Sequence, residues 1–362
     1  MISYRKGIVN SILREDENTT WVEVNIDGDL SKAINYNDLT GPVDIGDELI
    51  LNTTAVELSL GTGGYHFVIF NYSNKDKELE GKGHIMKLRY TPFQLKCLTA
   101  EEEDSPYHEL FNEFTGLNGS VFIVGTLHSM LAPLASMLKW FKPSLKINYI
   151  MTDGGALPIQ FSNTVKSLKN KEIIDSTITI GNAFGGDIEC VNIYSGLIAA
   201  KKILNSDVTI ITMGPGIAGT GTKYGFSGIE QGYIIDAVNN LGGTPFIAPR
   251  ISFKDDRERH RGISHHTLTS LSKACNTKGK LVIPYLTKDK DNLIREQLIA
   301  KNLFEKHNII YEEGSDIIKA LDYFNLNVST MGRDLKEDMD YFITLGAVAK
   351  STFLYLDGEE DV

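Results

Sequence analysis

Two different patterns of hydrophobic and polar positions divide the chain. Up to about residue 90, apolar positions occur in short runs rich in β-branched and aromatic residues, and Asp, Asn and Gly separate these runs. Such runs are typical of short strands joined by turns. Four strands at this spacing predict a small closed β-barrel of OB-like or SH3-like size over residues 1–90, with the strands at 7–13, 21–26, 48–51 and 65–72.

The pattern changes at Ser120, after a mixed connector over residues 91–119 that includes a short amphipathic helix at 105–114. Apolar runs of strand length then alternate with helical periodicity, which predicts a parallel sheet covered by helices on both faces. The predicted fold of residues 120–362 is therefore a doubly wound, mostly parallel, Rossmann-like α/β domain. Its strands are expected at 121–125, 147–151, 177–180, 208–213, 245–248, 280–285 and 309–311, and its helices at 129–140, 188–204, 229–240, 267–274, 293–306 and 338–354, ahead of an acidic tail at 357–362.

Composition narrows the class of protein. With 362 residues, 42% of them hydrophobic and 23% charged, the chain is typical of a soluble protein of two domains. Its apolar runs are shorter than a membrane-spanning helix, and its first residues lack the apolar core of a signal peptide. A net charge of -11 argues against nucleic acid and anionic membranes as partners. The three scattered cysteines form no CxxC pair, so we expect a cytoplasmic protein.

Glycines and polar residues that could bind a ligand or take part in catalysis follow the predicted strands at their carboxyl ends. His128 comes after the first strand of the α/β domain, Asp153 after the second, and Gly185, Gly186 and Asp187 after the third. The connections at the opposite ends of the strands read as plain turns. Because ligands of open α/β sheets bind at the carboxyl edge, we expect a crevice for a small molecule there.

The fourth strand leads into a glycine-rich loop, GPGIAGTGTKYG at 214–225. A GxGxxG sequence after a strand is a feature of dinucleotide-binding proteins, but here further glycines delay the next helix, and Arg250 stands where an acid would contact the ribose. The alternative is capture of a small anion by amides, hydroxyls and a lysine of the loop. The predicted ligand-binding residues are Gly185, Gly186, Gly214, Gly216, Gly219, Thr220, Gly221, Thr222, Lys223 and Arg250.

The segment 255–266 carries the densest group of reactive side chains. Three of the eight histidines, His260, His265 and His266, lie within seven residues, next to Asp255. Imidazole and carboxylate are ligands for zinc, manganese or iron, although the spacing matches no established metal motif. Histidine also titrates near neutral pH and serves as a general acid or base. We predict a divalent metal held by Asp153, Asp187, Asp255, His265 and His266, and acid–base catalysis by His128, His260 and Asp255.

Each of these features also has a structural interpretation. The glycine-rich loop suits a crossover that packs closely, and Asp187 suits the N-cap of the helix predicted after it. Asp256 and Arg259 suit an ion pair, and His265 suits a cap of the following helix. These alternatives stay open at the level of sequence.

Several stretches of the sequence are distinctive: LRYTPFQ, SPYHEL, GTLHSMLAP, MTDGGALP, NAFGGDIECVNIYSGL, MGPGIAGTGTKYGFSGIEQG, RISFKDDRERHRGISHH and TMGRDL. In these stretches the chain resembles a family of uncharacterised bacterial proteins, a domain of unknown function common in Gram-positive bacteria. The resemblance implies a bacterial cytoplasmic protein of this length, and it supplies no activity and no catalytic residues.

Three functions fit these observations. The leading hypothesis is a metal-assisted hydrolase or phosphotransfer enzyme that acts on a phosphorylated or otherwise anionic metabolite at the carboxyl edge of the sheet. The second is an oxidoreductase that binds NAD(P) or FAD through the GxGxxG sequence. The third is a non-catalytic metabolite sensor, because binding loops and catalytic loops have the same composition. A homo-oligomer is compatible with all three.

Overall fold

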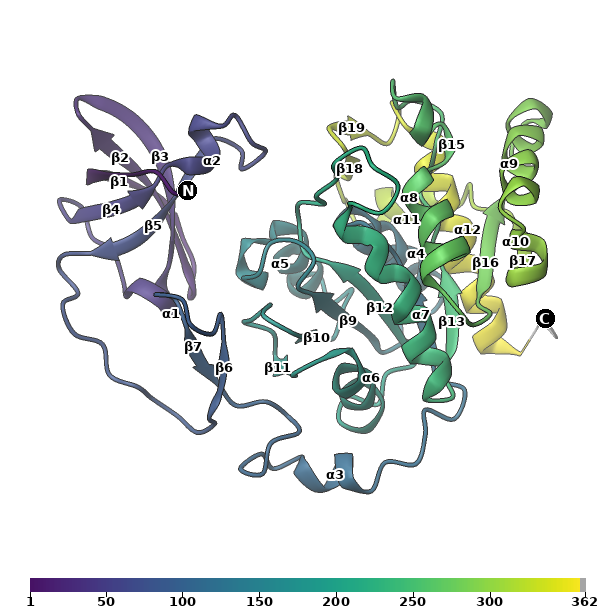
Figure 1. Ribbon diagram of the computed structural model, residues 1–362, viewed down its shortest axis with the longest axis horizontal. Helices are drawn as coiled ribbons and strands as arrows, with labels where there is room; N and C mark the ends of the chain where they lie inside the picture. The colour runs from purple at the N-terminus through teal and green to yellow at the C-terminus, as the bar shows by residue number, and fades with distance from the viewer. Residues whose placement is uncertain (359–362) are drawn as a thin grey trace. The chain divides into compact units, whose positions relative to one another are not determined.

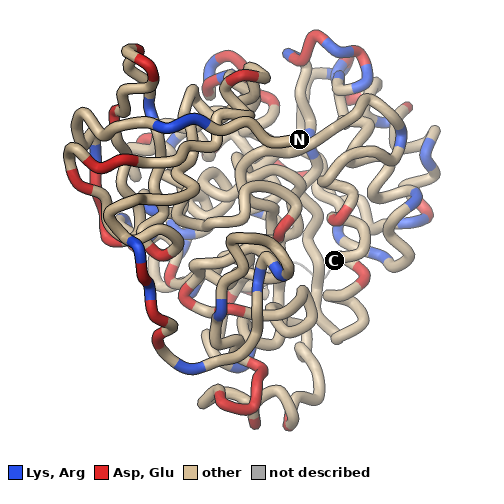
Figure 2. The backbone as a smooth tube through the Cα atoms, turned by 60° about the vertical axis from the view of Figure 1, so that its left-hand side comes forward, with Lys and Arg blue, Asp and Glu red and all other residues tan. Residues whose placement is uncertain are grey.

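Contacts within the chain divide the computed structural model, which describes residues 1–358, into two compact units. Met1–Cys97 form the first unit and Leu98–Val362 the second. The last four residues of the predicted acidic tail, 359–362, lie outside the described residues. Acidic and basic residues are interspersed along the backbone, and they lie close together in the charged segment 75–82 that follows β5 (Figure 2). Among the described residues, no helix is both long enough and apolar enough to cross a membrane.

The first unit contains a closed five-stranded barrel, which confirms the predicted fold (Figure 1). Its strands are β1 (Tyr4–Glu15), β2 (Thr19–Ile26), β3 (Asp29–Tyr36), β4 (Glu48–Asn52) and β5 (Tyr65–Asn71). They follow one another in the order β1–β2–β3–β5–β4, and β4 pairs back with β1. The pair β3–β5 is parallel and its neighbours in the barrel are antiparallel, so the barrel is mixed.

Strand β3 was absent from the predicted strands, because its sequence DLSKAINY has no continuous β-branched run. The turn before it was readable, since Asp27 and Gly28 form a two-residue loop between the paired residues Ile26 and Asp29. Both loop residues have positive φ, 52° and 101°, as a type I′ hairpin turn requires. The Asp-Gly pair therefore fixes the register of the β2–β3 hairpin.

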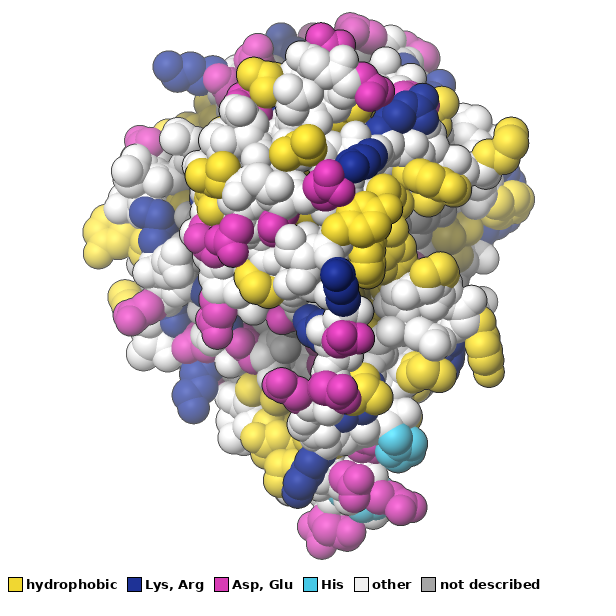
Figure 3. Space-filling model, turned by 90° about the vertical axis from the view of Figure 1, so that its left-hand side faces the viewer, with side chains coloured by type: hydrophobic (Ala, Val, Ile, Leu, Met, Phe, Trp, Pro, Cys, Tyr) yellow, Lys and Arg dark blue, Asp and Glu magenta, His cyan; other side chains and the backbone are white. Residues whose placement is uncertain are grey.

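The barrel has a small core of inward-facing aliphatic side chains. The exposed Phe70 and Tyr72 contact each other with ring centroids 5.5 Å apart. The face in Figure 3 shows apolar side chains both singly and in a group, among charged ones. Short elements complete this unit: α1 (Asn37–Thr40), α2 (Thr54–Glu57) and the hairpin of β6 (Ile85–Lys87) with β7 (Leu95–Cys97). The core residues of the barrel are Val9, Val22, Val24, Ala33, Val43, Leu49, Leu51 and Val68.

An eight-stranded, all-parallel sheet forms the centre of the second unit and confirms the predicted α/β fold. Its strands are β8 (Val121–Val124), β9 (Ile147–Thr152), β10 (Ser176–Thr179), β11 (Ile188–Glu189), β12 (Val208–Met213), β13 (Thr244–Ile247), β16 (Lys280–Pro284) and β17 (Asn308–Glu312). Their order in the sheet is β11–β10–β9–β12–β8–β13–β16–β17. The central strands are buried along their whole length, which explains their continuous apolar sequences.

Helices cover both faces of this sheet, as a doubly wound fold requires. Val121 and Ile123 of β8 point into one core and Phe122 and Val124 into the other, because successive side chains of a strand alternate. The first core takes side chains from α4 (Leu131–Phe141), α5 (Asn163–Asn170), α11 (Ile317–Tyr323) and α12 (Met339–Asp357). The second takes them from α6 (Ile193–Lys202), α7 (Glu230–Asn240), α8 (His265–Thr269), α9 (Lys288–Ala300) and α10 (Leu303–Lys306).

The predicted helix at 188–204 begins too early. Ile188 and Glu189 pair with β10 as an edge strand, and α6 starts at Ile193 behind the N-cap Asn192. Asp187 is therefore no helix cap. Smaller shifts affect the connector, where α3 covers only His108–Asn112, and the 267–274 helix, which is α8 followed by a π-helical turn at Ser270–Ala274.

The direction of the connections reverses between β9 and β12. The chain leaves β9 toward β10 on one side and leaves β12 toward β13 on the other. Beyond the strand ends the two loops are in contact, and the amide of Ala156 donates a 2.8 Å hydrogen bond to the carbonyl of Pro215. Thr152 and Met213 are paired neighbours at the last residue of each strand. Open α/β sheets bind ligands at such a point, where the direction of the connections reverses.

Candidate functional site

Two short antiparallel strands, β14 (Ile251–Ser252) and β15 (Gly262–Ile263), close the segment that follows β13 into a hairpin. The turn at its tip contains His260. Immediately after the hairpin, Ser264 caps helix α8 by accepting a hydrogen bond from the backbone amide of His266. The hairpin thus returns His260 to the first turn of the helix that carries His265 and His266.

The three histidines form one cluster. Each offers a ring nitrogen, and these nitrogens lie within 4.8 Å of one another. His260 and His266 are buried, whereas His265 is partly exposed. Nε2 of His265 and Nδ1 of His266 are both buried without a hydrogen-bond partner among residues 1–358. A set of converging imidazole nitrogens is the ligand type that zinc, iron and similar ions prefer.

All three imidazoles are held in the neutral form. Burial, assisted by the charge of Arg250, lowers the pKa of His260 to about 3, and burial lowers the pKa of His266 to about 4. Burial and then Arg259 lower the pKa of His265. A neutral imidazole has a lone pair free for a metal, so these side chains are in the right protonation state at pH 7.

The ring of His260 is oriented by Ser264. Its Nδ1 lies 2.7 Å from the hydroxyl oxygen of Ser264 and 3.3 Å from a guanidinium nitrogen of Arg250. Nδ1 cannot donate to Ser264 and accept from Arg250 at the same time. In the tautomer that suits a metal, Nδ1 donates to the closer Ser264, which leaves the lone pair on Nε2.

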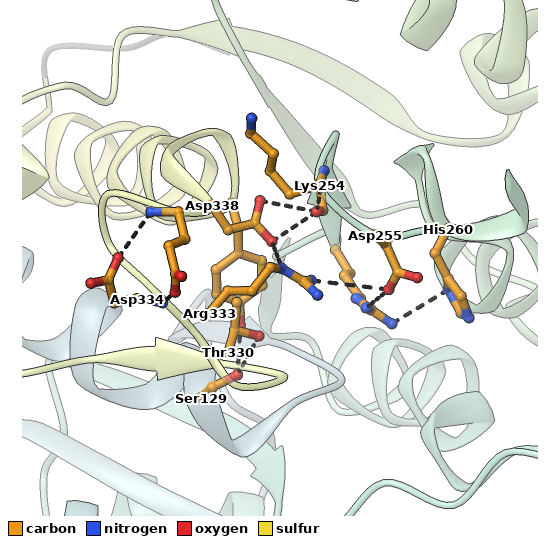
Figure 4. A network of polar contacts seen from close by, with 12 residues as sticks. Ser129, Lys254, Asp255, His260, Thr330, Arg333, Asp334 and Asp338 are labelled. Atoms are coloured by element: carbon orange, nitrogen blue, oxygen red, sulfur yellow. Dashed lines mark hydrogen bonds and ion pairs between the residues drawn. The ribbon is translucent and has the colours of Figure 1, made fainter. Parts of the chain in front are cut away.

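An ion-pair network centred on Asp255 joins residues of the hairpin to Arg250 and Arg333. Asp255, whose side chain is only 3% exposed, lies 2.8 Å from both Arg250 and Arg257 and 4.0 Å from Arg333. Arg333 also pairs with the buried Asp338, so it lies between the two acids (Figure 4). The hydrogen bonds from Arg257 and the charge of Arg250 hold the pKa of Asp255 well below its usual range. Both carboxylate oxygens of Asp255 are thus committed to arginine.

The glycine-rich loop packs against the histidine cluster. The ring of Phe226 stacks on His266 at 4.0 Å, and a Cβ atom at Gly219 would lie 3.3 Å from Cε1 of His266. A Cβ at Gly221 would lie 4.0 Å from a guanidinium nitrogen of Arg259. The loop and the histidines, far apart in sequence, therefore form one site.

Much of the hydrogen-bonding capacity of the loop is used within the loop. The hydroxyl and the amide of Thr220 both donate to the carbonyl of Gly225, and Thr222 accepts from the amide of Gly225. The ammonium group of Lys223 lies over the ring of Tyr224. Anion binding by Gly214, Gly216, Gly221 and the other predicted loop residues stays a prediction.

Other predicted site residues have partners of their own. His128 contacts the hydroxyls of Tyr149 (3.1 Å) and Ser162 (2.6 Å), and burial lowers its pKa to about 4. Asp187 pairs with Lys169 and accepts hydrogen bonds from the amide and hydroxyl of Thr177.

Two further predicted positions, Gly185 and Gly186, pack tightly against Gln160 and Thr179, where a Cβ atom would overlap those side chains. Within residues 1–358, the metal-ligand cluster contains the three histidines and neither Asp153 nor Asp187.

Glu230 is a candidate functional residue that the sequence interpretation missed. It opens helix α7 directly after the glycine-rich loop, is 5% exposed, and accepts a 2.5 Å hydrogen bond from the hydroxyl of Thr152. Burial, followed by the charge of Asp153, raises its pKa to about 7. The signal in the sequence was an acidic residue at the first turn of the helix that follows the loop.

The fold and the site define an α/β protein with a separate five-stranded barrel and a candidate metal centre after strand β13. Residues 32–349 match the family described as "Protein of unknown function (DUF3866)", and the chain belongs to this family. The predicted resemblance to a family of unknown function is thereby confirmed. A comparison with curated proteins found no match.

Proposed function

We propose that His260, His265 and His266 bind a transition-metal ion and that the protein is a metal-assisted hydrolase or phosphotransfer enzyme for a phosphorylated or otherwise anionic metabolite. The observation that carries the proposal is the pair of unpartnered buried nitrogens on His265 and His266. An ion held by three imidazoles keeps a coordination position open, where it can activate water or polarise a phosphoryl oxygen.

The two unpartnered nitrogens favour a metal site over a purely structural cluster. A buried polar atom without a partner costs about 1–3 kcal/mol, so two such nitrogens cost roughly 2–6 kcal/mol in a protein that never binds a ligand there. A core histidine normally avoids this cost through a hydrogen bond, as His307 does with the carbonyl of Leu271. A metal bound through these two nitrogens would remove this cost.

The charge around the cluster supports an anionic substrate. Arg257 and Arg259 are exposed beside the histidines, and Arg259 also approaches the loop at Gly221. Three loop amides already have partners: those of Thr220 and Thr222 donate within the loop, and that of Ala218 donates to the hydroxyl of Ser227. Recognition of a phosphate or carboxylate would therefore depend on the arginines more than on the loop amides.

The NAD(P) or FAD alternative has less support. Helix α7 begins at Glu230, well after Gly219, the third glycine of the GxGxxG sequence. A dinucleotide fingerprint needs the helix to begin at the glycines so that its N-terminus meets the pyrophosphate. Here the first helical residue is Glu230, whose carboxyl group stands where the pyrophosphate would bind.

Cobalt titration tests the metal site. We expect Co²⁺ to bind at about one ion per chain and to give d–d absorption bands characteristic of nitrogen ligation. The variant His265→Ala/His266→Ala should lose the bands, whereas His84→Ala, which removes an exposed histidine of the barrel unit, should keep them. Equal binding by both variants, or no binding by the unaltered protein, would refute the metal site.

Hydrolysis of p-nitrophenyl phosphate by the metal-loaded protein tests the reaction. Arg259→Ala should raise the KM by about tenfold with little change in kcat, because it removes a contact to the substrate anion. Arg261→Ala is the matched control, since Arg261 is an exposed neighbour in the same hairpin. Metal binding without turnover of any phosphomonoester would favour the metabolite sensor instead.

A further inference from the structure

A pocket lies at the carboxyl ends of β9 and β10, where helices α6 and α7 begin. It has a volume of about 210 Å³. Its polar wall contains the carboxylates of Asp153 and Glu230 and the hydroxyl of Tyr233, and Tyr233 is 53% exposed, so solvent reaches the pocket. Its apolar wall includes Ile180, Ile193 and Ile234.

The two carboxylates are held in place by close packing. Asp153 accepts a 3.0 Å hydrogen bond from the amide of Asn182, and a Cβ atom at Gly181 would overlap its carboxylate. A Cβ atom at Gly154 would lie 3.0 Å from the carboxylate of Glu230. Gly181 and Gly154 therefore leave room for the two carboxylates.

The lining residues include no lysine, arginine or histidine. Two acidic groups thus share a small, partly apolar space without a positive charge from the pocket wall. Burial is the main cause that raises the pKa of Glu230, and the charge of Asp153 raises it further. This unbalanced negative charge excludes an anionic ligand and favours a cation.

We propose that this pocket binds a small organic cation, with a primary ammonium group between Asp153 and Glu230 and a short carbon chain against the isoleucines. An ammonium group donates three hydrogen bonds, which suits two carboxylates and the Tyr233 oxygen. A hydrated Mg²⁺ ion suits the pocket less well, because it keeps several waters that the apolar wall cannot hydrogen-bond. The site is separate from the histidine cluster and does not depend on the proposed function.

Binding of a cation should release protons. The pKa of Glu230 is about 7, so about half of the molecules hold a proton there at pH 7, and a nearby ammonium lowers this pKa. The other titratable groups that interact with Glu230 are Asp153, Tyr233 and Tyr149, and both tyrosines stay neutral because burial raises their pKa values. The affinity should therefore increase as the pH rises through 7.

Isothermal titration calorimetry with n-butylammonium chloride tests the proposal. In PIPES and ACES buffers, which differ in ionisation enthalpy, we expect saturable binding at pH 7 with release of about half a proton. Glu230→Gln should weaken binding by at least about tenfold and abolish the proton release. Glu296→Gln, an exposed glutamate on α9, is the matched control and should bind normally.

Further titrations separate this proposal from its competitors. Tyr233→Phe leaves both carboxylates and should weaken binding only a few fold, which keeps the test decisive if Glu230→Gln does not fold. The His265→Ala/His266→Ala variant should bind n-butylammonium normally. Equal binding of n-butanol, displacement of n-butylammonium by millimolar MgCl₂, or the absence of any saturable heat would each overturn the assignment.

Discussion

Replacement of Asp255 should destabilise the second unit strongly. In Asp255→Ala, the guanidinium of Arg250, whose side chain is only 4% exposed, loses its carboxylate partner and stays buried. Removal of one partner of a buried ion pair typically costs about 3–5 kcal/mol. The partner Arg257 is 43% exposed and adds little, and Arg333 keeps its pair with Asp338. We therefore attribute nearly all of the expected loss to Arg250.

Tryptophan fluorescence can follow this loss in the second unit alone. The chain has two tryptophans, Trp21 in the barrel and Trp140 in helix α4, so a Trp21→Phe background reports on α4. A loss of about 3–5 kcal/mol corresponds to a Tm decrease of roughly 6–20 °C for a unit of this size. Asp256→Ala, at the exposed neighbouring residue, should change stability by no more than about 0.5 kcal/mol.

Two results would refute this reasoning. The first is an Asp255→Ala variant no less stable than Asp256→Ala. The second is a double variant, Arg250→Met/Asp255→Leu, as unstable as Asp255→Ala, because removal of both charges should recover most of the loss. The pH dependence gives an independent check. The pKa of Asp255 is lowered in the fold, so its contribution is complete above the unfolded pKa of about 3.9 and declines as the pH falls further. The difference between Asp255→Ala and the unaltered protein should therefore shrink by roughly 1 kcal/mol between pH 7 and pH 3.

Three further variants test other parts of the structure by urea unfolding. Because the pKa of Glu230 is raised in the fold, the free energy of unfolding declines as the pH rises from about 4.3 through 7. The stability of Glu230→Gln relative to the unaltered protein should therefore rise by up to about 3 kcal/mol between pH 4 and pH 8. The same pH dependence of stability in both proteins would contradict this. Gly214→Ala should cost about 1–3 kcal/mol, because the new Cβ would overlap the carbonyl of Ala156, whereas Gly61→Ala points into open space and should be nearly neutral. Asn192→Ala removes the capping box of α6 and should cost about 1 kcal/mol, and Asn192→Ser should restore most of it; an equal loss in both would count against the cap.

The fold class was predictable because a parallel strand that is buried on both faces has a continuous apolar sequence. Val208–Met213 is apolar or β-branched throughout, and every residue of it is buried. The order of the strands was not predictable in the same way. Strand β12 lies between β9 and β8, and a crossover of the same length would reach other positions in the sheet equally well.

The end of β10 shows how local and tertiary signals compete. Helical periodicity from Ile188 suggested a long helix, but Ile188 and Glu189 pair with β10 instead. The true start was readable in the sequence, because Asn192 and Ser195 are spaced as a capping box. Asp187 resembled a cap, but its carboxylate is used by Lys169 and Thr177, and Lys169 lies 18 residues earlier in the chain.

The candidate site was predictable only where its residues are close in sequence. His265 and His266 are adjacent, and the hairpin that carries His260 spans only residues 251–263. Arg333 supports the same cluster from the far end of the chain, and no local pattern indicates that contact. Asp153 was expected beside the histidines, since both follow strand ends, yet it lines the separate pocket with Glu230. Two residues that follow strand ends at the same edge of a sheet therefore need not contact each other.

The glycine-rich loop now has a more specific interpretation than anion binding. Near its start, Gly214 and Gly155 let two backbones pass in contact where β9 and β12 end. In its middle, Gly219 approaches the ring of His266, and Phe226 stacks on that ring from the same loop. Four residues after Phe226, Glu230 enters the pocket that it lines with Asp153. Close approach of backbone or ring accounts for these glycines without a phosphate. The loop is the element that joins the histidine cluster to the acidic pocket, so a ligand in either would contact residues that the loop positions.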